Sequence, residues 1–378
     1  MKILMIHLGA YGDCILATPL ARQIKTDYPG AHLTWAIATR YASAIENNPD
    51  VDDIWKVDIQ PSEPFLSLSW RNQFLKTIDA KYGPDYFDIV FDTMIHPNNR
   101  GHFDGTIRSS TLANYPRPIT VPIAPIIRLH ESEYAHVRAF AETHALDQFR
   151  HVILFESTPG SNQSVLNLEL GMKLAKAIVD RREDTIIIIS TYKPVPAIHP
   201  RIIGADTLSF RENVALSHFC TFLIGGSSGL SWLLTSDCAK KIPTVQFLTR
   251  QLSSGFASMV YDFTYFGLST EHILESQTTH PADMATLVLS ALDDFPHARK
   301  RYHETLRPYF WNWLYFVDWP HGIKGIFLSY RTMFAFIRRN GFRIRDLFEL
   351  WPILSALCVA WNMFVVQPLS RFFQGGRP

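Results

Sequence analysis

Short apolar runs alternate with helix-like patterns through the first 90 residues. The run Lys2–His7 is bounded by glycine and predicts a buried strand, and apolar positions recur at helical spacing from Ile15 to Ile24. Further strands are predicted at 32–39, 54–57 and 87–91. Strands that alternate with helices indicate a parallel sheet with helices on its faces.

The same alternation starts again after a proline-containing join and a polar helix at 131–146. Strands are predicted at 151–155, 185–190, 222–224 and 242–248, and helices at 168–179, 212–219 and 230–238. The sequence therefore predicts an α/β protein with two Rossmann-like domains that face each other across a cleft, with ligands at the carboxyl ends of the strands. We place the first domain at 1–145, the second at 146–300 and a helical extension at 301–378.

Composition excludes several classes of protein. Hydrophobic residues make up 47% and charged residues 19% of the 378 residues, which indicates a folded core and not disorder. The net charge of +1 argues against a nucleic-acid binder. The four cysteines show no CxxC spacing, so we expect neither a disulfide scaffold nor a cysteine zinc site. A reducing compartment and the lack of a signal-peptide pattern together predict a cytoplasmic protein.

The C-terminal segment has a different composition from the rest. From residue 320 onward there are eight basic and two acidic residues, and five of the nine tryptophans follow residue 310. The apolar run Trp351–Val366 is shorter than the roughly 20 residues of a membrane span. A basic and aromatic segment is typical of one that binds an anionic membrane surface, here through residues 320–378. Packing on the body of the protein or a dimer interface is the alternative.

Asp13 is the first candidate for chemistry. It follows a predicted strand and a glycine turn and opens a helix. A carboxylate in this place either caps the helix or acts as a general base at the edge of the cleft. The local pattern alone favours the cap.

Two polar turns in the second half form the next candidate. The turn Gly225–Gly229 lies between a strand and a helix, where free N–H groups and hydroxyls suit a phosphate. An ordinary strand-to-helix turn needs the same residues. The turn Ser157–Asn162 holds the equivalent place one unit earlier, and two such turns favour a diphosphate pocket. Neither GxGxxG nor a Walker A pattern is present.

The loop after the fourth predicted strand holds basic side chains. His96, Arg100 and His102, together with Arg108, are candidates to meet an anionic acceptor, with a solvated loop as the alternative. The histidine spacing fits no zinc pattern. The segment Asp50–Asp53 contains a DxD but precedes a strand, so we predict no metal site.

The opening of the chain resembles that of the glycosyltransferase family 9 enzymes, the ADP-heptose:lipopolysaccharide heptosyltransferases. The shared features are the strand, the GxxGD turn that ends at Asp13, and the Thr18-Pro19-Leu20 helix. The turn Pro159–Ser161 and the stretch Phe210–Thr235 resemble later landmarks of the family. The resemblance covers about residues 1–300.

The resemblance implies a GT-B fold and inverting, metal-independent transfer of a heptose or similar sugar. The donor would be a nucleotide-diphospho-sugar, with no further cofactor, and the acceptor a hydroxyl of a lipopolysaccharide core or another lipid-linked glycan. Asp13 would be the catalytic base. The enzyme would work at the inner face of the inner membrane. We assign the donor site to Ser157, Gly160, Ser161, Asn162, Ser227, Ser228 and Gly229, and the acceptor side to Gly12, His96, Arg100 and His102.

Several positions depart from the family pattern. Ser227, Ser228 and Trp232 stand where the family has Asp, Thr and His, and the lysine that follows its PGxS turn is missing. Lys193 or Arg211 is expected to supply the cation if the donor is unchanged. These departures keep open a non-catalytic relative, a scaffold or sugar-nucleotide sensor in glycan assembly. A sugar-nucleotide epimerase or dehydrogenase is a third class, disfavoured by the lack of GxGxxG.

Overall fold

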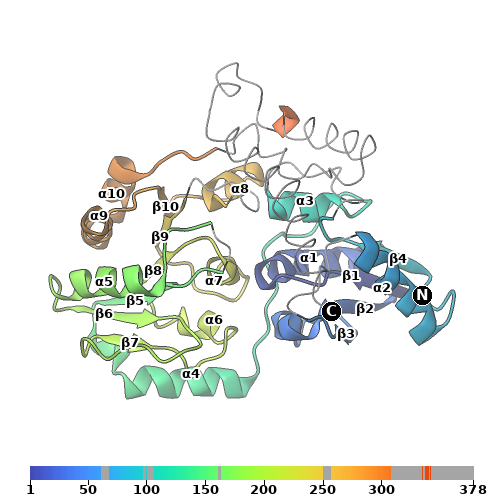
Figure 1. Cartoon of the computed structure of the whole chain (residues 1–378), viewed down its shortest axis with the longest axis horizontal. Coiled ribbons are helices and arrows are strands. Elements are labelled where there is room, and N and C mark those ends of the chain that lie inside the picture. Colours follow the sequence, from blue (N-terminus) through green and yellow to red (C-terminus); the bar gives the residue numbers. More distant parts are fainter. Residues whose placement is uncertain are drawn as a thin grey trace, which may run out of the picture.

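The computed structural model describes residues 1–60, 68–96, 99, 106–160, 163–249, 257–307, 334, 337–339 and 341. Within these ranges the chain forms two separate sheets, one from each half of the sequence, and every strand pair is parallel (Figure 1). Parallel neighbours need a crossover connection, which is why helices and loops separate the strands.

The first sheet has the strand order β3-β2-β1-β4. Its strands are β1 (Lys2–Ile6), β2 (His32–Ala38), β3 (Asp53–Val57) and β4 (Ile89–Asp92). The helices of this half are α1 (Tyr11–Asp27), the 3₁₀ helix η1 (Thr39–Ile45), α2 (Leu68–Tyr82) and α3 (Ile107–Ala113). All residues of β1 after Lys2 are buried, as expected for an inner strand covered on both faces.

The second sheet has the order β10-β9-β8-β5-β6-β7. Its strands are β5 (His151–Phe155), β6 (Thr185–Ile189), β7 (Ile202–Gly204), β8 (Phe222–Gly225), β9 (Thr244–Phe247) and β10 (Ile273–Ser276). Its helices are α4 (Glu131–Thr143), η2 (Leu146–Gln148), α5 (Leu168–Val179), α6 (Asn213–Leu216), α7 (Gly229–Leu233), α8 (Met259–Tyr265), α9 (Pro281–Asp293) and α10 (Phe295–Tyr302). On one side of the sheet α5 packs against α9, and α9 against α10.

The predicted α/β architecture with two parallel sheets is confirmed. The elements that the sequence did not reveal are the outer strands β7 and β10, together with α2, α3, α8, α9 and α10. Both outer strands are short, with three residues in β7 and four in β10. The predicted helix at 212–219 is shorter in the structure, where α6 ends at Leu216, and the one predicted at 230–238 ends at Leu233.

Helix α4 lies beside the second sheet, although it precedes the domain boundary that we expect at residues 145 and 146 (Figure 1). It packs against α6, and Ala145 follows it in the left-handed conformation, with φ of 47°. The three-part division of the chain stays a prediction.

Most of the predicted membrane-binding segment, residues 320–378, lies outside the described residues. Within it Arg339 contacts both halves of the protein. Its Nη1 donates to Thr106 Oγ1 at 2.7 Å and Ser109 Oγ at 2.6 Å, and its guanidinium lies over the rings of Tyr261 and Tyr265. The helices searched, which belong to the described residues, include none long and apolar enough to cross a membrane.

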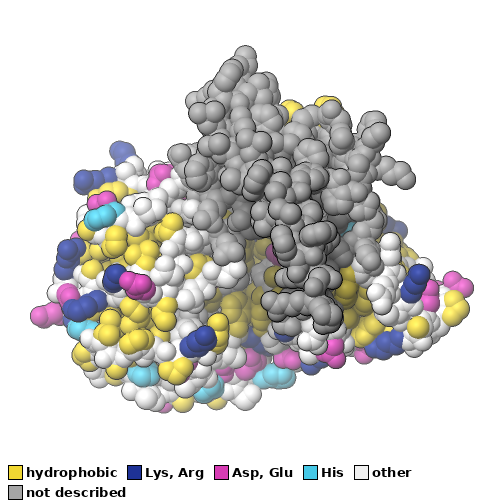
Figure 2. Space-filling model, in the orientation of Figure 1, with side chains coloured by type: hydrophobic (Ala, Val, Ile, Leu, Met, Phe, Trp, Pro, Cys, Tyr) yellow, Lys and Arg dark blue, Asp and Glu magenta, His cyan; other side chains and the backbone are white. Residues whose placement is uncertain are grey.

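Basic and acidic side chains are interspersed over both halves on the face that Figure 2 shows. This mixed surface agrees with the net charge of +1. It gives no support to a nucleic-acid interface on that face, because such an interface gathers basic side chains.

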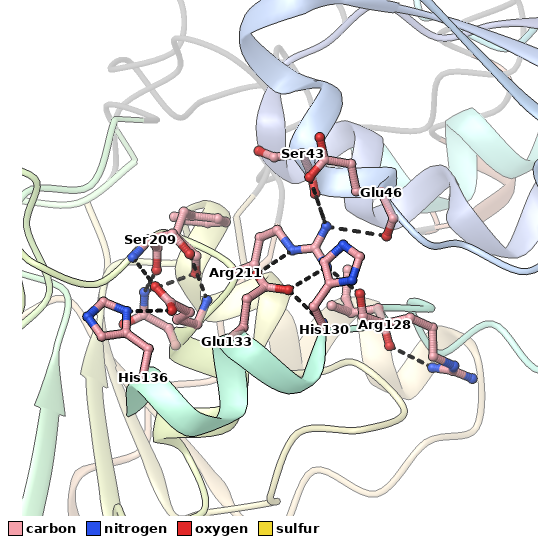
Figure 3. A network of polar contacts seen from close by, with 12 residues as sticks. Ser43, Glu46, Arg128, His130, Glu133, His136, Ser209 and Arg211 are labelled. Carbon is pink, nitrogen blue, oxygen red and sulfur yellow. Dashed lines mark hydrogen bonds and ion pairs between the residues drawn. The ribbon is translucent and has the colours of Figure 1, made fainter. Parts of the chain in front are cut away.

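Arg211 ties the two halves together (Figure 3). It lies just before α6, and its Nη1 donates to the carbonyl oxygen of Ser43 at 2.9 Å. Its Nε lies 3.0 Å from Glu133 Oε1, and Nη1 lies 3.4 Å from Glu46 Oε2. Arg211 also donates to the carbonyl oxygen of Arg128 in the segment that joins the halves. These contacts hold η1, the joining segment and α4 in one arrangement.

We expect Arg211→Ala to lower the free energy of unfolding by about 3 kcal/mol, because it leaves the Glu133 carboxylate without its buried partner. Arg128→Ala is the matched control. It removes an ion pair with Asp237 whose side chains are 40% and 28% exposed, so its cost should stay below about 1 kcal/mol. Urea unfolding measures both variants, and equal losses would contradict the role given to Arg211.

Candidate functional site

A cavity of about 810 Å³ lies between the two halves, at the carboxyl ends of the strands. One wall comes from the turn after β1 and from α3, and the other from the segments that follow β5, β6, β7 and β8. The second sheet reverses its strand order between β5 and β8. Open α/β sheets bind ligands at such reversal points, so this cavity is the candidate site.

Asp13 lines this cavity from the first turn of α1. The helix begins at Tyr11, so Ala10 is the N-cap and Asp13 lies three residues beyond it. The Asp13 Oδ2 atom accepts a hydrogen bond from the Ala10 N–H at 3.0 Å. Burial raises the pKa of Asp13 above its usual value. A carboxylate with a raised pKa in a cavity wall is a stronger base than one in water.

The glycine turns of the two halves meet beside Asp13. A Cβ atom on Gly12 would lie 3.4 Å from the Gly229 Cα and 3.9 Å from Cδ1 of Trp232. Because neither glycine carries a side chain, α1 and α7 approach closely at this point. The predicted base therefore lies next to the turn that we assign to the donor.

Glu156, which the sequence reading missed, organises that turn. It follows β5, is 4% exposed and lines the cavity. Its Oε2 accepts from Gly226 N–H at 3.0 Å and Ser231 Oγ at 2.8 Å, and its Oε1 from Ser228 Oγ at 2.5 Å and Leu230 N–H at 3.1 Å. A carboxylate with four donors is held firmly in the interior. Glu156 fixes the turn from a neighbouring strand.

The predicted donor residues Ser227, Ser228 and Gly229 line the cavity, as the sequence suggests. Their hydroxyls, however, bond within the protein, because Ser227 donates to the Ala257 carbonyl and Ser228 to Glu156. The Ser227 N–H donates to Gln246 Oε1 at 2.5 Å, and its φ of 51° places it in the left-handed region. The turn therefore presents a fixed backbone to the cavity.

The other predicted donor turn is only partly in the wall. Gly160 and the adjacent Thr158 line the cavity. Ser157 is fully buried instead, and its Cβ lies 2.6 Å from where a Cβ on Gly171 of α5 would be. Close packing of α5 on β5 draws Ser157 away from the cavity. Ser161 and Asn162 lie outside the described residues.

On the acceptor side, Gly12 lines the cavity and His96 does not. The Nε2 atom of His96 lies 2.9 Å from Asp92 Oδ2 at the end of β4, and Arg71 pairs with the same carboxylate. The attraction of this carboxylate explains why His96 is held at the sheet edge. Arg100 and His102 lie outside the described residues.

Each carboxylate of the DxD segment pairs with a basic side chain. The pairs are Asp50 with Arg22 at 3.0 Å, Asp52 with Lys25, and Asp53 with His32 at 2.6 Å. Among the residues that the structure describes, no group of three or more His, Cys, Asp or Glu side chains could hold a metal ion.

The two cations that we expected to replace the family lysine lie elsewhere. Arg211 is engaged in the contacts between the halves, and Lys193 is exposed outside the cavity wall. Arg108 lines the cavity in their place, from the first turn of α3. Its Nη2 lies 2.6 Å from Asp262 Oδ2 of α8, and both side chains are at least 96% buried.

Aromatic rings enclose the Arg108 guanidinium. Its Cζ lies 5.1 Å from the ring centroid of Trp232, 5.3 Å from Phe263 and 5.6 Å from Phe266. Burial lowers the pKa of Arg108, and the Asp262 carboxylate opposes that change. The cation thus joins α3 of the first half to α8 and α7 of the second.

A second buried carboxylate positions α8. The Oε2 atom of Glu275, at β10, accepts from Ser258 Oγ at 2.6 Å, and Oε1 accepts from the Val260 N–H at 3.1 Å. Burial raises the pKa of Glu275 to about 7. Glu275 thereby fixes the start of the helix that carries Asp262.

Part of the cavity wall is less polar, where Ala205 and Leu208 line it. Ser190 and Tyr192 line the same cavity. Phe210 also lines it, but at the contact between the halves, where its Cζ lies 3.2 Å from where a Cβ on Gly229 would be. The Tyr192 side chain is 82% exposed, unusual for an aromatic residue. A flat aromatic ring beside an apolar wall suits a planar ring system such as a nucleobase.

Two solved structures share this architecture at low sequence identity. The glycosyl transferase family 9 protein from Veillonella parvula DSM 2008 is 15% identical, with a TM-score of 0.50, over 78% of this chain and 92% of that one. The E. coli ADP-heptose lps heptosyltransferase II is 13% identical, also with a TM-score of 0.50, over 80% and 99%. This chain has the GT-B fold. No family model matches the sequence, and no curated protein matches it significantly.

The resemblance seen in the sequence thus extends to the three-dimensional fold, and the predicted fold class is confirmed. The first landmark, the turn before Asp13, lies at the cavity, as does the later turn at Ser227–Gly229. Arg108, which the sequence named as a candidate to meet an anionic acceptor, also lies in the cavity wall. Its pair with Asp262 and the role of Glu156 became visible only in three dimensions.

We expect Asp13→Asn to raise the Tm at pH 7. The raised pKa means that the folded protein binds this proton more tightly than the unfolded chain, so wild-type stability falls as pH rises through the interval between the two pKa values. Asparagine avoids that loss and keeps an acceptor for the Ala10 N–H. Thermal unfolding between pH 4 and pH 8 should show the advantage shrinking toward pH 4, and a lower Tm for the variant at pH 7 would contradict the burial of this charge.

Proposed function

We propose that this chain is an inverting glycosyltransferase that moves a sugar from a nucleoside diphosphate to a hydroxyl group. The observation that carries the proposal is the position of Asp13, in a cavity wall opposite the Ser227–Gly229 turn and between the two halves of a GT-B fold. A base on one side and a donor site on the other is the arrangement that such a transfer needs.

In this proposal the nucleoside of the donor lies beside Tyr192. Stacking on Tyr192 and contact with Leu208 would hold the base, and the hydroxyl oxygen of Ser190, which lines the same cavity, would accept a hydrogen bond from the ribose. The diphosphate then lies toward Thr158, Gly160 and the Ser227–Gly229 turn. This direction leaves the anomeric carbon near Asp13.

The reaction is a single displacement. Asp13 takes the proton of the acceptor hydroxyl, whose oxygen forms a bond to the anomeric carbon. The bond from that carbon to the phosphate oxygen breaks, and its electron pair leaves with the nucleoside diphosphate. Attack from the face opposite the leaving group inverts the anomeric centre.

The acceptor in this proposal is a lipopolysaccharide core or another lipid-linked glycan, and the sugar is a heptose or a similar one. Two observations support this choice: one structural relative is an ADP-heptose lps heptosyltransferase, and residues 320–378 have a basic, aromatic composition. The enzyme would work in the cytoplasm at the inner face of the inner membrane, without a metal ion.

A second candidate is a non-catalytic sugar-nucleotide sensor or scaffold. The observation in its favour is that the Ser228 hydroxyl and the N–H groups of Gly226 and Leu230 all bond to Glu156. These groups are unavailable to a phosphate while that carboxylate holds them. Donor turnover by purified protein separates the two candidates.

We expect Asp13→Asn to lower the rate of sugar transfer at least about 100-fold, because general-base catalysis contributes on that scale. Nucleotide binding should stay close to that of wild type. The assay follows transfer from labelled ADP-, UDP- and GDP-sugars to lipopolysaccharide-core and lipid-linked acceptors.

Asp147→Asn, at an exposed carboxylate of η2, is the matched control and should transfer sugar like wild type. Full activity of Asp13→Asn would contradict the assignment of Asp13 as the general base. Nucleotide binding by wild type without turnover of any donor would favour the sensor.

We expect the full-length protein to sediment with phosphatidylserine vesicles and not with neutral phosphatidylcholine vesicles. Replacing Arg343 and Arg345 by glutamate should reduce the bound fraction, because each basic residue near an anionic surface adds about 1 kcal/mol. The control variant replaces Arg150 and Lys173, which lie outside residues 320–378, by glutamate. Equal sedimentation of both variants and wild type would contradict membrane binding through the C-terminal segment.

A further inference from the structure

Arg108 is the one Lys or Arg side chain in the wall of the cavity, among the residues that the structure describes. The same wall contains the carboxyl groups of Asp13, Glu156 and Asp262. A nucleoside diphosphate brings further negative charge into this space. The Arg108 cation is therefore the side chain in this wall that can offset the charge of a bound nucleoside diphosphate.

The position of Arg108 is fixed from several sides. Asp262 holds Nη2 at 2.6 Å, the Ile123 carbonyl oxygen lies 3.5 Å from Nη1, and aromatic rings surround the guanidinium. Its Nε is buried and has no hydrogen-bond partner in the described part of the chain. A buried donor without a partner is costly, and a ligand oxygen would satisfy it.

Arg108 is also close to the reacting groups. Trp232, whose ring lies 5.1 Å from the guanidinium, approaches the backbone of Gly12, and Gly12 is the neighbour of Asp13 in sequence. The cation comes from the half that carries the base, whereas the Ser227–Gly229 turn belongs to the other half. All three groups line the same cavity.

We propose that Arg108 is a catalytic residue that receives the charge developing on the nucleoside diphosphate as it leaves, an inference that rests on the function proposed above. When Asp13 has taken the acceptor proton and the bond to the anomeric carbon breaks, the electron pair stays on the phosphate oxygen. A guanidinium donates two hydrogen bonds to such an oxygen pair and keeps its own proton. Charge stabilisation of this kind is often the largest single contribution to catalysis.

Asp262 has a different role from Arg108. In the structure it balances Arg108, which would otherwise be an isolated charge in the interior. The diphosphate then competes with Asp262 for the guanidinium. Removing the two charges should therefore have opposite effects on ligand binding, whereas a purely structural ion pair would suffer similarly from either loss.

The test measures the affinities of nucleoside diphosphates and monophosphates by calorimetry, with ADP/AMP, UDP/UMP and GDP/GMP, and kcat with the active donor. Wild type should prefer the diphosphate by at least about tenfold, because the added phosphate meets a buried cation. Arg108→Gln should lose this preference and lower kcat at least about 100-fold. Asp262→Asn should bind the diphosphate more tightly than wild type.

The double variant Arg108→Gln with Asp262→Asn restores neutrality, so its Tm should return toward wild type while kcat stays low. Arg117→Gln, at a cation that stacks on Tyr28 outside the cavity, is the control and should match wild type in every measurement. Recovery of kcat in the double variant, or equal losses of affinity in both single variants, would overturn the role of Arg108. A wild-type protein that binds no nucleotide and transfers no sugar would overturn the proposed function together with this inference.

Discussion

The backbone contact between the two halves, at Gly12 and Gly229, is the constraint on which the site depends. Two parallel sheets present the carboxyl ends of their strands to each other, and at this point a Cβ on Gly12 would already touch the Gly229 Cα, at 3.4 Å. Because both positions are glycine, the first turn of α1 meets the first turn of α7. Asp13 and the donor-side turn consequently line one cavity. Arg211 on one side, and Arg108 with Arg339 on the other, connect the halves around it.

From the part of the chain that the structure describes, the site gathers one cation and three carboxyl groups around one cavity. Glu156 is stabilised by four donors, and Asp262 by the Arg108 cation. Among the described residues Asp13 accepts one hydrogen bond, from the Ala10 N–H, and burial raises its pKa. Because their surroundings differ, the three carboxylates have different roles. Glu156 positions a turn, Asp262 balances a cation, and Asp13 retains the basicity that the proposed transfer requires.

Local patterns were enough to predict the inner strands and the position of Asp13. Apolar runs such as Lys2–His7 and Thr185–Ser190 are long enough to show a buried strand, and a glycine turn directly after a strand marks the edge where ligands bind. The short outer strands β7 and β10 gave no such signal. Local patterns also assigned His96 to the acceptor, but the Asp92 carboxylate holds it at the end of β4.

The rest of the site was not predictable because it depends on contacts between distant residues. Glu156 meets the Gly225–Gly229 turn from about 70 positions away, and Arg108 meets Asp262 across more than 150. Nothing in the sequence near Glu156 distinguishes it from any other glutamate at a strand end. A strand that ends in a carboxylate beside a serine-rich glycine turn is a signal to look for in other sequences of this fold.

Hydrogen–deuterium exchange of the wild-type protein with and without nucleoside diphosphates tests the central claim most directly, since it asks where the donor binds. We predict slower exchange on binding in the segments 158–160, 190–192 and 225–230 of the second half and at 106–109 of the first, with α9 and α10 unchanged. Protection confined to the second half would separate the nucleotide from Arg108 and leave donor binding intact. The absence of protection in all four segments, with any of the nucleotides, would contradict the placement of a nucleotide-sugar site in this cavity.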